Sequence, residues 1–297
     1  MFKDQMFKEI CRIRAAVQQK APLIHCITNP ISIHDCANVV LAVGGRPMMA
    51  EHPAEVEEIT VTAGALALNL GNITDARKAS ILIAGRAAMT RNIPVILDMV
   101  GIGCSHFRKG ILEEFLRQRI QGTHLVLKGN MSELKALAGT GCSVSGVDVD
   151  PKDVLSEDNR AETIELAKSV ARTYGAVVLA SGKTDLVTDG ERVCLIGNGS
   201  EMMSRITGTG CMLNVLAAAY MSAGEPMAAA TAACVVLGIS GEIAAQQCLE
   251  NGGGRSGPGR FCGTGSFQIA FQDVLSSITD GEICSRMHID FAASDTE

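Results

Sequence analysis

Thr207-Gly208-Thr209-Gly210-Cys211 is a glycine-rich turn that leads directly into a long apolar helix, predicted from Met212 to Met221. The first N–H groups of a helix lack partners within the helix, and the helix dipole is positive at that end, so such a turn can hold a phosphate. The same field lowers the pKa of a thiol, and we expect Cys211, as the first helical residue, to favour thiolate. Taken alone, the turn is equally consistent with a tight connection, and Cys211 by itself is better explained as a small helix-packing residue.

Composition narrows the class of protein. The 297 residues carry a formal charge of -6, only 3% are aromatic and none is Trp, so we expect no nucleic-acid partner, although a local basic pocket is compatible with these values. The beginning of the chain lacks an apolar signal core, and no uninterrupted apolar run reaches membrane-spanning length, so no membrane partner is expected. The 11 cysteines form no C-x-x-C pair, which argues against zinc and favours a reducing, cytoplasmic setting.

Apolar strands alternate with helices along most of the chain. This order predicts an α/β fold with a mainly parallel sheet and helices on both faces, in which ligands bind at the carboxyl ends of the strands. We expect one domain over residues 1–297, loops at 141–157 and 252–265, a hairpin around Asp189-Gly190 and a loose tail at 280–297. The principal strands are expected at 23–27, 64–70, 94–98, 124–127 and 176–180, and the helices at 5–19, 33–43, from Pro53, 73–91, 106–120, 131–138, 161–173, 212–223, 227–247 and 267–278.

Two acidic residues follow neighbouring strands. Asp98 ends one apolar strand, and Glu133 follows the next in the fragment Lys128-Gly129-Asn130-Met131-Ser132-Glu133. Two carboxylates at adjacent strand ends can share a hydrated Mg²⁺. The competing interpretations are a helix or loop cap for Asp98 and, for Asn130 with Glu133, a capping box.

Two nucleotide-binding fingerprints are not met. Ser181-Gly182-Lys183-Thr184 contains G-K-T, but position 177 is Val rather than Gly, and the segment leads into a hairpin rather than a helix, which excludes a Walker site. No complete G-x-G-x-x-G follows a strand, so an NAD-linked oxidoreductase has little support. His25 and His34 are isolated, and we expect strand-end or surface roles for them.

Taken in order, the motifs resemble the hydroxyethylthiazole kinases of thiamine salvage, within the ribokinase-like superfamily. Each fragment is weak by itself, but the ordered set is specific and spans roughly residues 20 to 280. The matching fragments are Ile27-Thr28-Asn29, Pro47-Met48-Met49-Ala50, Ala63 to Gly71, Ile96-Leu97-Asp98, Lys128-Gly129-Asn130 with Glu133, Ala180-Ser181-Gly182 with Asp185, Thr207 to Cys211, and Gly265-Ser266-Phe267.

The resemblance implies a three-layer ribokinase-like fold, a homotrimer with active sites between subunits, and Mg²⁺-dependent transfer of the ATP γ-phosphoryl group to 4-methyl-5-(2-hydroxyethyl)thiazole. Phosphoryl transfer has a loose transition state, so a weak base such as Cys is sufficient, and amides of the turn, including those of Thr209 and Gly210, would stabilise phosphoryl oxygens. The resemblance implies these roles: catalytic base, Cys211; thiazole pocket, Met49 and Gly208, with Asn29 nearby; nucleotide contacts, Lys128 and Ser181; Mg²⁺ region, Asp98 and Glu133.

The chain departs from the family pattern at several positions. Met99 stands where the family has Pro, Lys128 where Arg is common and Ser181 where Thr is frequent, and the glycine-rich stretch from Gly252 to Gly263 is expanded. Lysine keeps the charge of arginine but loses its bidentate phosphate geometry. The departures leave open a kinase of another small hydroxylated heterocycle, and a non-catalytic ligand or nucleotide sensor is the alternative from a different class.

Overall fold

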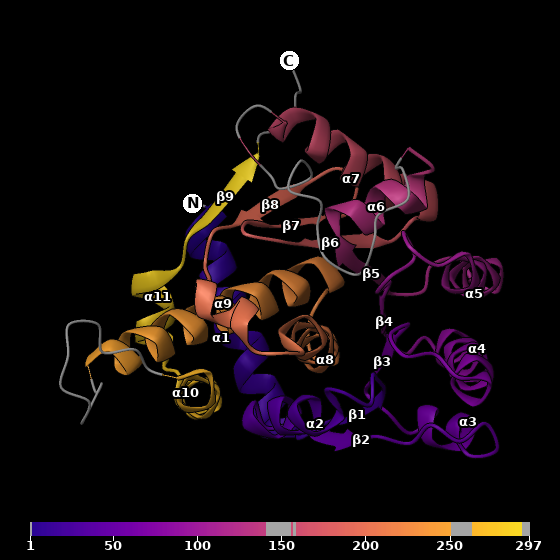
Figure 1. Cartoon of the computed structure of the whole chain (residues 1–297), viewed down its shortest axis with the longest axis horizontal. Coiled ribbons are helices and arrows are strands. Elements are labelled where there is room, and N and C mark those ends of the chain that lie inside the picture. Colours follow the sequence, from indigo (N-terminus) through magenta and orange to yellow (C-terminus); the bar gives the residue numbers. More distant parts are fainter. Residues whose placement is uncertain (1, 141–155, 157–158, 251–262, 293–297) are drawn as a thin grey trace.

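A computed structural model describes residues 2–140, 156, 159–250 and 263–292. Its strands form one nine-stranded sheet, parallel from β2 to β6 and antiparallel from β6 to β9 (Figure 1). The predicted hairpin is confirmed as β7 and β8. In sheet order the strands are β2 (Arg46–Met48), β1 (Leu23–Ile27), β3 (Ala65–Asn69), β4 (Val95–Asp98), β5 (Leu125–Asn130), β6 (Val177–Ser181), β7 (Asp185–Thr188), β8 (Val193–Ile196) and β9 (Ile289–Ala292).

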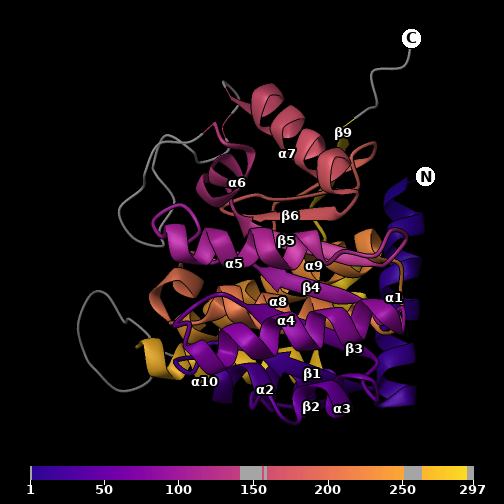
Figure 2. The ribbon, with the colours of Figure 1, turned by 90° about the vertical axis from the view of Figure 1, so that its right-hand side faces the viewer.

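Helices cover both faces of the sheet, which confirms the predicted α/β architecture (Figure 2). Alternate residues of a strand point to opposite faces, and in β3 the small Ala65 and Ala67 face α8 while Leu66 and Leu68 face α4. One core contains residues of α1 (Phe2–Lys20), α2 (Ile33–Ala42), α8 (Thr209–Met221), α9 (Pro226–Glu250), α10 (Thr264–Ser277) and α11 (Asp280–Arg286); the other contains residues of α3 (Val56–Thr60), α4 (Asp75–Thr90), α5 (His106–Arg117), α6 (Met131–Ala138) and α7 (Arg160–Tyr174).

The register of the parallel strands sets polar side chains side by side at one edge of the sheet. Asn69 pairs with Asp98, and Asp98 pairs with Lys128, so the ends of β3, β4 and β5 are level. One strand further, Asn130 pairs with Ser181. This edge is the carboxyl end of the parallel strands, where ligands of open α/β sheets bind.

α9 has the length and composition of a membrane-spanning helix. Its most apolar window has a mean hydropathy of 1.7, but 89% of that window is buried inside the protein. The helix packs against α8 and α10 and behaves as a core helix, in which an apolar residue is needed on every side.

The structure corrects the expected tail at 280–297. A capping box between Thr279 and Glu282 begins α11, and β9 extends the sheet beside β8. Ile283 and Met287 are buried in the core, which provides the apolar contacts that hold this segment. Residues 293–297 lie outside the described residues, as does most of the two expected loops, 141–155 with 157–158 and 251–262.

Several helix boundaries also differ from expectation by about three residues, among them the start of α8 at Thr209 rather than Met212. The acidic helix expected from Pro53 begins at Val56, after a turn. The helix expected from Phe267 begins at Thr264, so Gly265 is helical and not part of a loop.

Candidate active site

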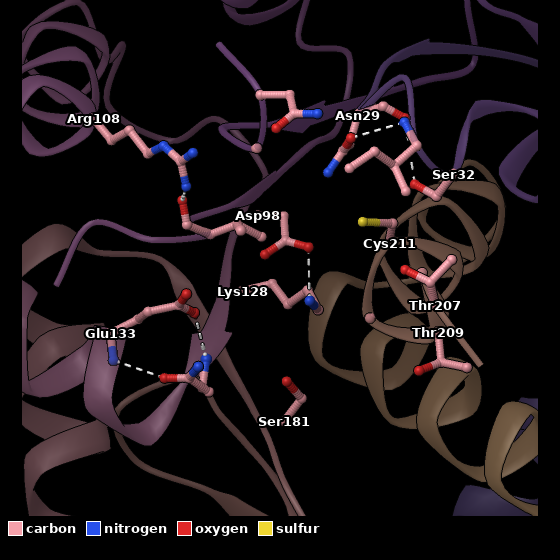
Figure 3. Close-up of a pocket in the computed structure, with 17 residues that line it drawn as sticks. Asn29, Ser32, Asp98, Arg108, Lys128, Glu133, Ser181, Thr207, Thr209 and Cys211 are labelled. Carbon is pink, nitrogen blue, oxygen red and sulfur yellow. Dashed lines mark hydrogen bonds and ion pairs between the residues drawn. The ribbon is translucent and has the colours of Figure 1, made fainter. Parts of the chain in front are cut away.

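A cavity of about 420 Å³ opens at the carboxyl ends of the parallel strands. Its walls come from the segments after β1, β3, β4, β5 and β6 and from the beginning of α8 (Figure 3). Residues brought together here, out of those expected from the sequence, are Asn29, Asp98, Lys128, Glu133, Ser181, Gly208, Thr209, Gly210 and Cys211. Met49 does not line the cavity; it lies after β2, half-buried against the core.

Gly208 shapes the turn that begins α8. It adopts a left-handed conformation with φ +87°, and a Cβ atom there would lie 2.7 Å from the Cβ of Ser32. Glycine is therefore required both by the backbone and by the close approach of α2. Thr209, Gly210 and Cys211 in the first turn of α8 line the cavity, and the N–H groups at the start of a helix lack partners within the helix.

Cys211 is the third residue of α8, not the first, and is only 8% exposed. The expected lowering of its pKa is wrong: burial raises the pKa of the thiol, and the nearby Asp98 carboxylate raises it further. Lys128 and hydrogen bonds from Ser32 and Asn69 act in the opposite direction but are smaller. Cys211 is thus a neutral thiol near pH 7, because desolvation outweighs the field at the helix end.

Asn69, which was not predicted as a site residue, holds Cys211 and Asp98 together. Its Nδ2 lies 3.3 Å from Cys211 Sγ and 3.2 Å from Asp98 Oδ2. The N–H of Gly71 donates to Asn69 Oδ1 over 2.8 Å, which directs the amide nitrogen toward these two partners. Asn69 ends β3 as Asp98 ends β4, so the strand-end rule that identified Asp98 would have identified it too.

Asp98 and Lys128 form a buried ion pair. Lys128 Nζ donates to Asp98 Oδ2 over 2.7 Å, and both side chains are nearly inaccessible to solvent. Burial raises the pKa of Asp98, while Lys128 opposes this shift. Burial acts to lower the pKa of Lys128, but the adjacent Asp98 raises it, and the net shift is upward, so the lysine stays charged.

Glu133 is held by backbone amides on both carboxylate oxygens. Asn130 and Glu133 form the capping box that was the competing interpretation, with the Asn130 N–H on Oε2 at 2.8 Å. The Gly101 N–H donates to Oε1, also over 2.8 Å, and ties the loop after β4 to α6. Burial, with repulsion from Asp98, raises the pKa of Glu133 to about 7.

Arg77 fixes the loop that follows β3 from beneath. Its side chain is 2% exposed and its guanidinium donates to the carbonyl oxygens of Asn69, Gly71 and Asn72 at 2.5 to 3.0 Å. Its Nε lies 3.4 Å from the Glu51 carboxylate on the segment after β2. The sequence signal for this role is a charged residue on a helix whose other buried positions are mostly apolar.

The segment after β6 places Ser181 at the cavity. Ser181 Oγ donates to the Gly129 carbonyl at 3.5 Å, and Asp185 Oδ1 accepts the N–H of Gly182 at 2.9 Å. On the opposite wall, Asn29 Oδ1 accepts from Ile31 N at 2.9 Å. A Cβ at Gly71 would lie 2.7 Å from Asn29 Nδ2, so this glycine makes room for the amide.

The buried carboxylate at the end of β4 can serve as an oxygen ligand of Mg²⁺. Asp98 is one of the residues that line the cavity, and its Oδ1 is buried without a hydrogen-bond partner in the described part of the chain. No group of three or more His, Cys, Asp and Glu side chains is arranged as a metal site among the described residues. Mg²⁺ needs only one or two carboxylates when nucleotide phosphates and waters complete its coordination, so these residues fit that ion.

Met99, where the family pattern has Pro, extends the pairing of β4 and β5. Its backbone N–H donates to the Lys128 carbonyl over 2.8 Å, a bond that proline cannot form. Its side chain is buried, and Gly129 is close enough that a Cβ there would lie 3.1 Å from Met99 Cε. The departure therefore anchors the backbone of Lys128.

A solved structure of low sequence identity shares the fold. Pyridoxal kinase from Staphylococcus aureus in complex with AMP-PCP superposes with a TM-score of 0.54 at 16% sequence identity, covering 74% of this chain and 87% of that chain. At this identity the similarity concerns the fold alone. The architecture is that of the ribokinase-like α/β proteins, and a glycine turn at a helix N-terminus beside a buried carboxylate gives its cavity the character of a phosphoryl-transfer site.

The particular family follows from closer relatives. A sequence profile of the hydroxyethylthiazole kinase family matches residues 15–281. Hydroxyethylthiazole kinase 2 of Clostridium botulinum (strain Okra) is 43% identical over 278 residues, which cover 94% of this chain and 98% of that protein. The hydroxyethylthiazole kinase structure from Pyrococcus horikoshii has a TM-score of 0.81 and 31% identity, covering 96% of this chain and all of that one. The chain belongs to the hydroxyethylthiazole kinase family.

Proposed function

We propose that the protein transfers the γ-phosphoryl group of ATP to the primary hydroxyl of 4-methyl-5-(2-hydroxyethyl)thiazole. The observation that supports this most is the meeting of Cys211, Asp98 and the first turn of α8 at one cavity wall. A base, a carboxylate for a metal ion and amides for an oxyanion are the parts that phosphoryl transfer uses. Membership of the kinase family supports the same reaction.

In the proposed mechanism the substrate oxygen attacks the γ-phosphorus as the bond to the bridging oxygen of ADP breaks. Cys211 Sγ accepts the hydroxyl proton in its thiolate form, which Asn69 and Lys128 stabilise. Amides of Thr209 and Gly210 would bind oxygens of the transferred group. Mg²⁺, held through Asp98 with Glu133 nearby, would neutralise phosphate charge when bound. Because the transition state is loose, a small thiolate fraction is sufficient.

We assign the substrate and nucleotide contacts as the resemblance implies. Gly208 and Asn29 would contact the thiazole alcohol, and Lys128 and Ser181 the nucleotide. Met49 lies outside the cavity of a single chain, which supports a site completed by another subunit of a homotrimer. The side chain of Ile31 lines the cavity yet is 61% exposed, as expected of a residue that a neighbouring copy covers. Sedimentation of the protein and of Ile31→Arg tests the assembly, and a monomeric wild type would contradict it.

The decisive experiment incubates the protein with Mg²⁺, ATP and the thiazole alcohol. ADP and the thiazole phosphate should form in equal amounts, measured by coupled assay and mass spectrometry. A protein that binds both ligands without substrate-dependent turnover would be the sensor alternative, detected as ligand-induced thermal stabilisation. Turnover with a panel of other small alcohols, but not with this one, would assign another heterocycle.

A further inference from the structure

A second cation borders the cavity on the side away from α8. Arg108 lies in the first turn of α5, where its own N–H donates to the N-cap oxygen of Ser105 at 3.3 Å. Its side chain is half-buried, lines the cavity and donates from Nη1 to the Val100 carbonyl over 3.1 Å (Figure 3). The guanidinium is therefore held at the cavity by the loop after β4.

Gly101 makes this position of the guanidinium possible. It has φ +76°, and a Cβ there would lie 2.1 Å from Arg108 Nη1, a distance no side chain permits. The Gly101 N–H is in turn bonded to Glu133 Oε1, so the loop beneath the guanidinium is fixed. The structure thus reserves space for the arginine side chain on a rigid part of the wall.

The charges that line the cavity are unequally compensated. Lys128 and Asp98 neutralise each other across 2.7 Å, and both oxygens of Glu133 accept backbone N–H groups. Arg108 has no ion pair within the described residues, and its side chain donates a hydrogen bond to a neutral carbonyl, that of Val100. An arginine has five N–H donors in a fixed fork, so most of its donors remain for a ligand.

We propose that Arg108 binds the terminal phosphates of the nucleotide through its guanidinium. A planar fork matches two phosphate oxygens, whereas the neutral thiazole alcohol offers no anion to this charge. Lys128, a point charge already bonded to Asp98, cannot supply that bidentate geometry. Arg108 therefore orients the phosphoryl donor from the wall opposite α8, and this role rests on ATP being the donor in the proposed function.

The test measures nucleotide binding in the absence of any alcohol. Calorimetric titration with AMP, ADP and a non-hydrolysable ATP analogue, each with Mg²⁺, is compared for the wild type, Arg108→Met and Arg108→Lys. Arg108→Met should weaken ADP and the analogue about 10- to 100-fold, the size of a charged hydrogen-bond pair, and AMP at most about threefold. Arg108→Lys should fall between the wild type and Arg108→Met. The matched control is Arg117→Met, at the exposed far end of the same helix, which should bind all three as the wild type does.

Equal weakening of AMP, ADP and the analogue would overturn the proposal, because loss of the Val100 contact would then disturb the whole site. Unchanged affinities would overturn it as well. Thermal unfolding midpoints of the variants establish whether each is folded. If Arg108→Met does not fold, the comparison of Arg108→Lys with the wild type still tests the proposal. Arg108-dependent binding of ADP by a wild type that does not phosphorylate the thiazole alcohol would refute the proposed acceptor but not the role of Arg108. If the wild type phosphorylates the thiazole alcohol but Arg108→Met binds ADP and the analogue as the wild type does, the role of Arg108 is refuted and the proposed acceptor is not.

Discussion

Two parts of the cavity wall are built in different ways. In the side-chain cluster, which comprises Asn69, Asp98, Lys128 and Cys211, the side chains bond to one another. In the backbone-anchored set, which comprises Arg108, Glu133 and Ser181, the side chains bond to main-chain groups. A substitution in the side-chain cluster removes a hydrogen-bond partner of other side chains in the cluster. A substitution in the backbone-anchored set leaves the hydrogen bonds of the other side chains in place. The cluster should therefore be the less tolerant part.

The largest effect is expected for Asp98→Asn. It leaves the Lys128 ammonium buried without its counter-ion, and breaking a buried pair in this way costs about 3–5 kcal/mol of unfolding free energy. The double variant Asp98→Asn with Lys128→Met should recover most of that loss in urea unfolding but none of the turnover. Equal stability of Asp98→Asn and the wild type would show that the pair contributes nothing.

The next effect is that of Cys211→Ala, which should lower kcat about 100-fold, or about 2.7 kcal/mol, if the thiol acts as general base. Because the raised pKa keeps the thiol neutral near pH 7, log kcat of the wild type should rise with pH as thiolate forms, and the variant should lack this rise. Cys284→Ala, at an exposed cysteine of α11, is the control. A variant with unchanged turnover would make Cys211 a packing residue.

A smaller loss is expected for Asn69→Ala. Removing its amide leaves Cys211 and Asp98 without the donor they share, and kcat should fall about tenfold, the value of roughly one buried hydrogen bond. Affinity for ADP should not change, because the amide nitrogen of Asn69 is already occupied by its hydrogen bonds to Cys211 and Asp98. Asn38→Ala, on α2, should leave kcat unaltered. Loss of ADP affinity with intact kcat would contradict the assignment.

The smallest effect concerns Asp185, which anchors Gly182 beside Ser181. Burial raises the pKa of Asp185 from 3.8 to about 6. A carboxyl whose pKa is raised on folding contributes stability below pH 3.8 that is lost as pH rises through about 6. Asp185→Asn keeps an acceptor for Gly182 but does not titrate, so its stability relative to the wild type should improve between about pH 4 and 7. Urea midpoints across this range measure the difference, and parallel pH profiles would refute it.

The sequence predicts which residues belong to the side-chain cluster better than it predicts the direction of their pKa shifts. Strand ends located Asp98 and Lys128, because parallel strands bring their carboxyl ends to one edge. The pKa of Cys211 was predicted in the wrong direction, since the field of a helix end is visible in sequence but the burial of a thiol is not. The position of the Arg108 guanidinium depends on the absence of a side chain at Gly101, seven residues earlier. The sequence does not show that these two residues come together in the fold.

The fold was predictable where elements are long or strongly apolar. β1 and α6 agree with their predicted bounds, because each is delimited by a clear turn or cap. α11 and β9 were missed, since four residues of alternating pattern resemble a tail until their partner strand is known. The Thr279 and Glu282 capping box was the available signal for that segment.

The contacts of α1 with the last described elements bear on the order in which the protein folds on the ribosome. Arg14 in α1 bonds to Asp280 and to the carbonyl of Ile278, and Phe2 packs on Phe291 of β9. The partners of Arg14 follow it by 264 and 266 residues, and Phe291 follows Phe2 by 289, so they are synthesised after the parallel strands have emerged. α1 also packs against α8 and α9, which emerge earlier, so only the part of α1 that contacts α11 and β9 stays unpaired until those elements emerge. In a nascent chain arrested before residue 278, this part of α1 should be more accessible to protease than in the complete chain.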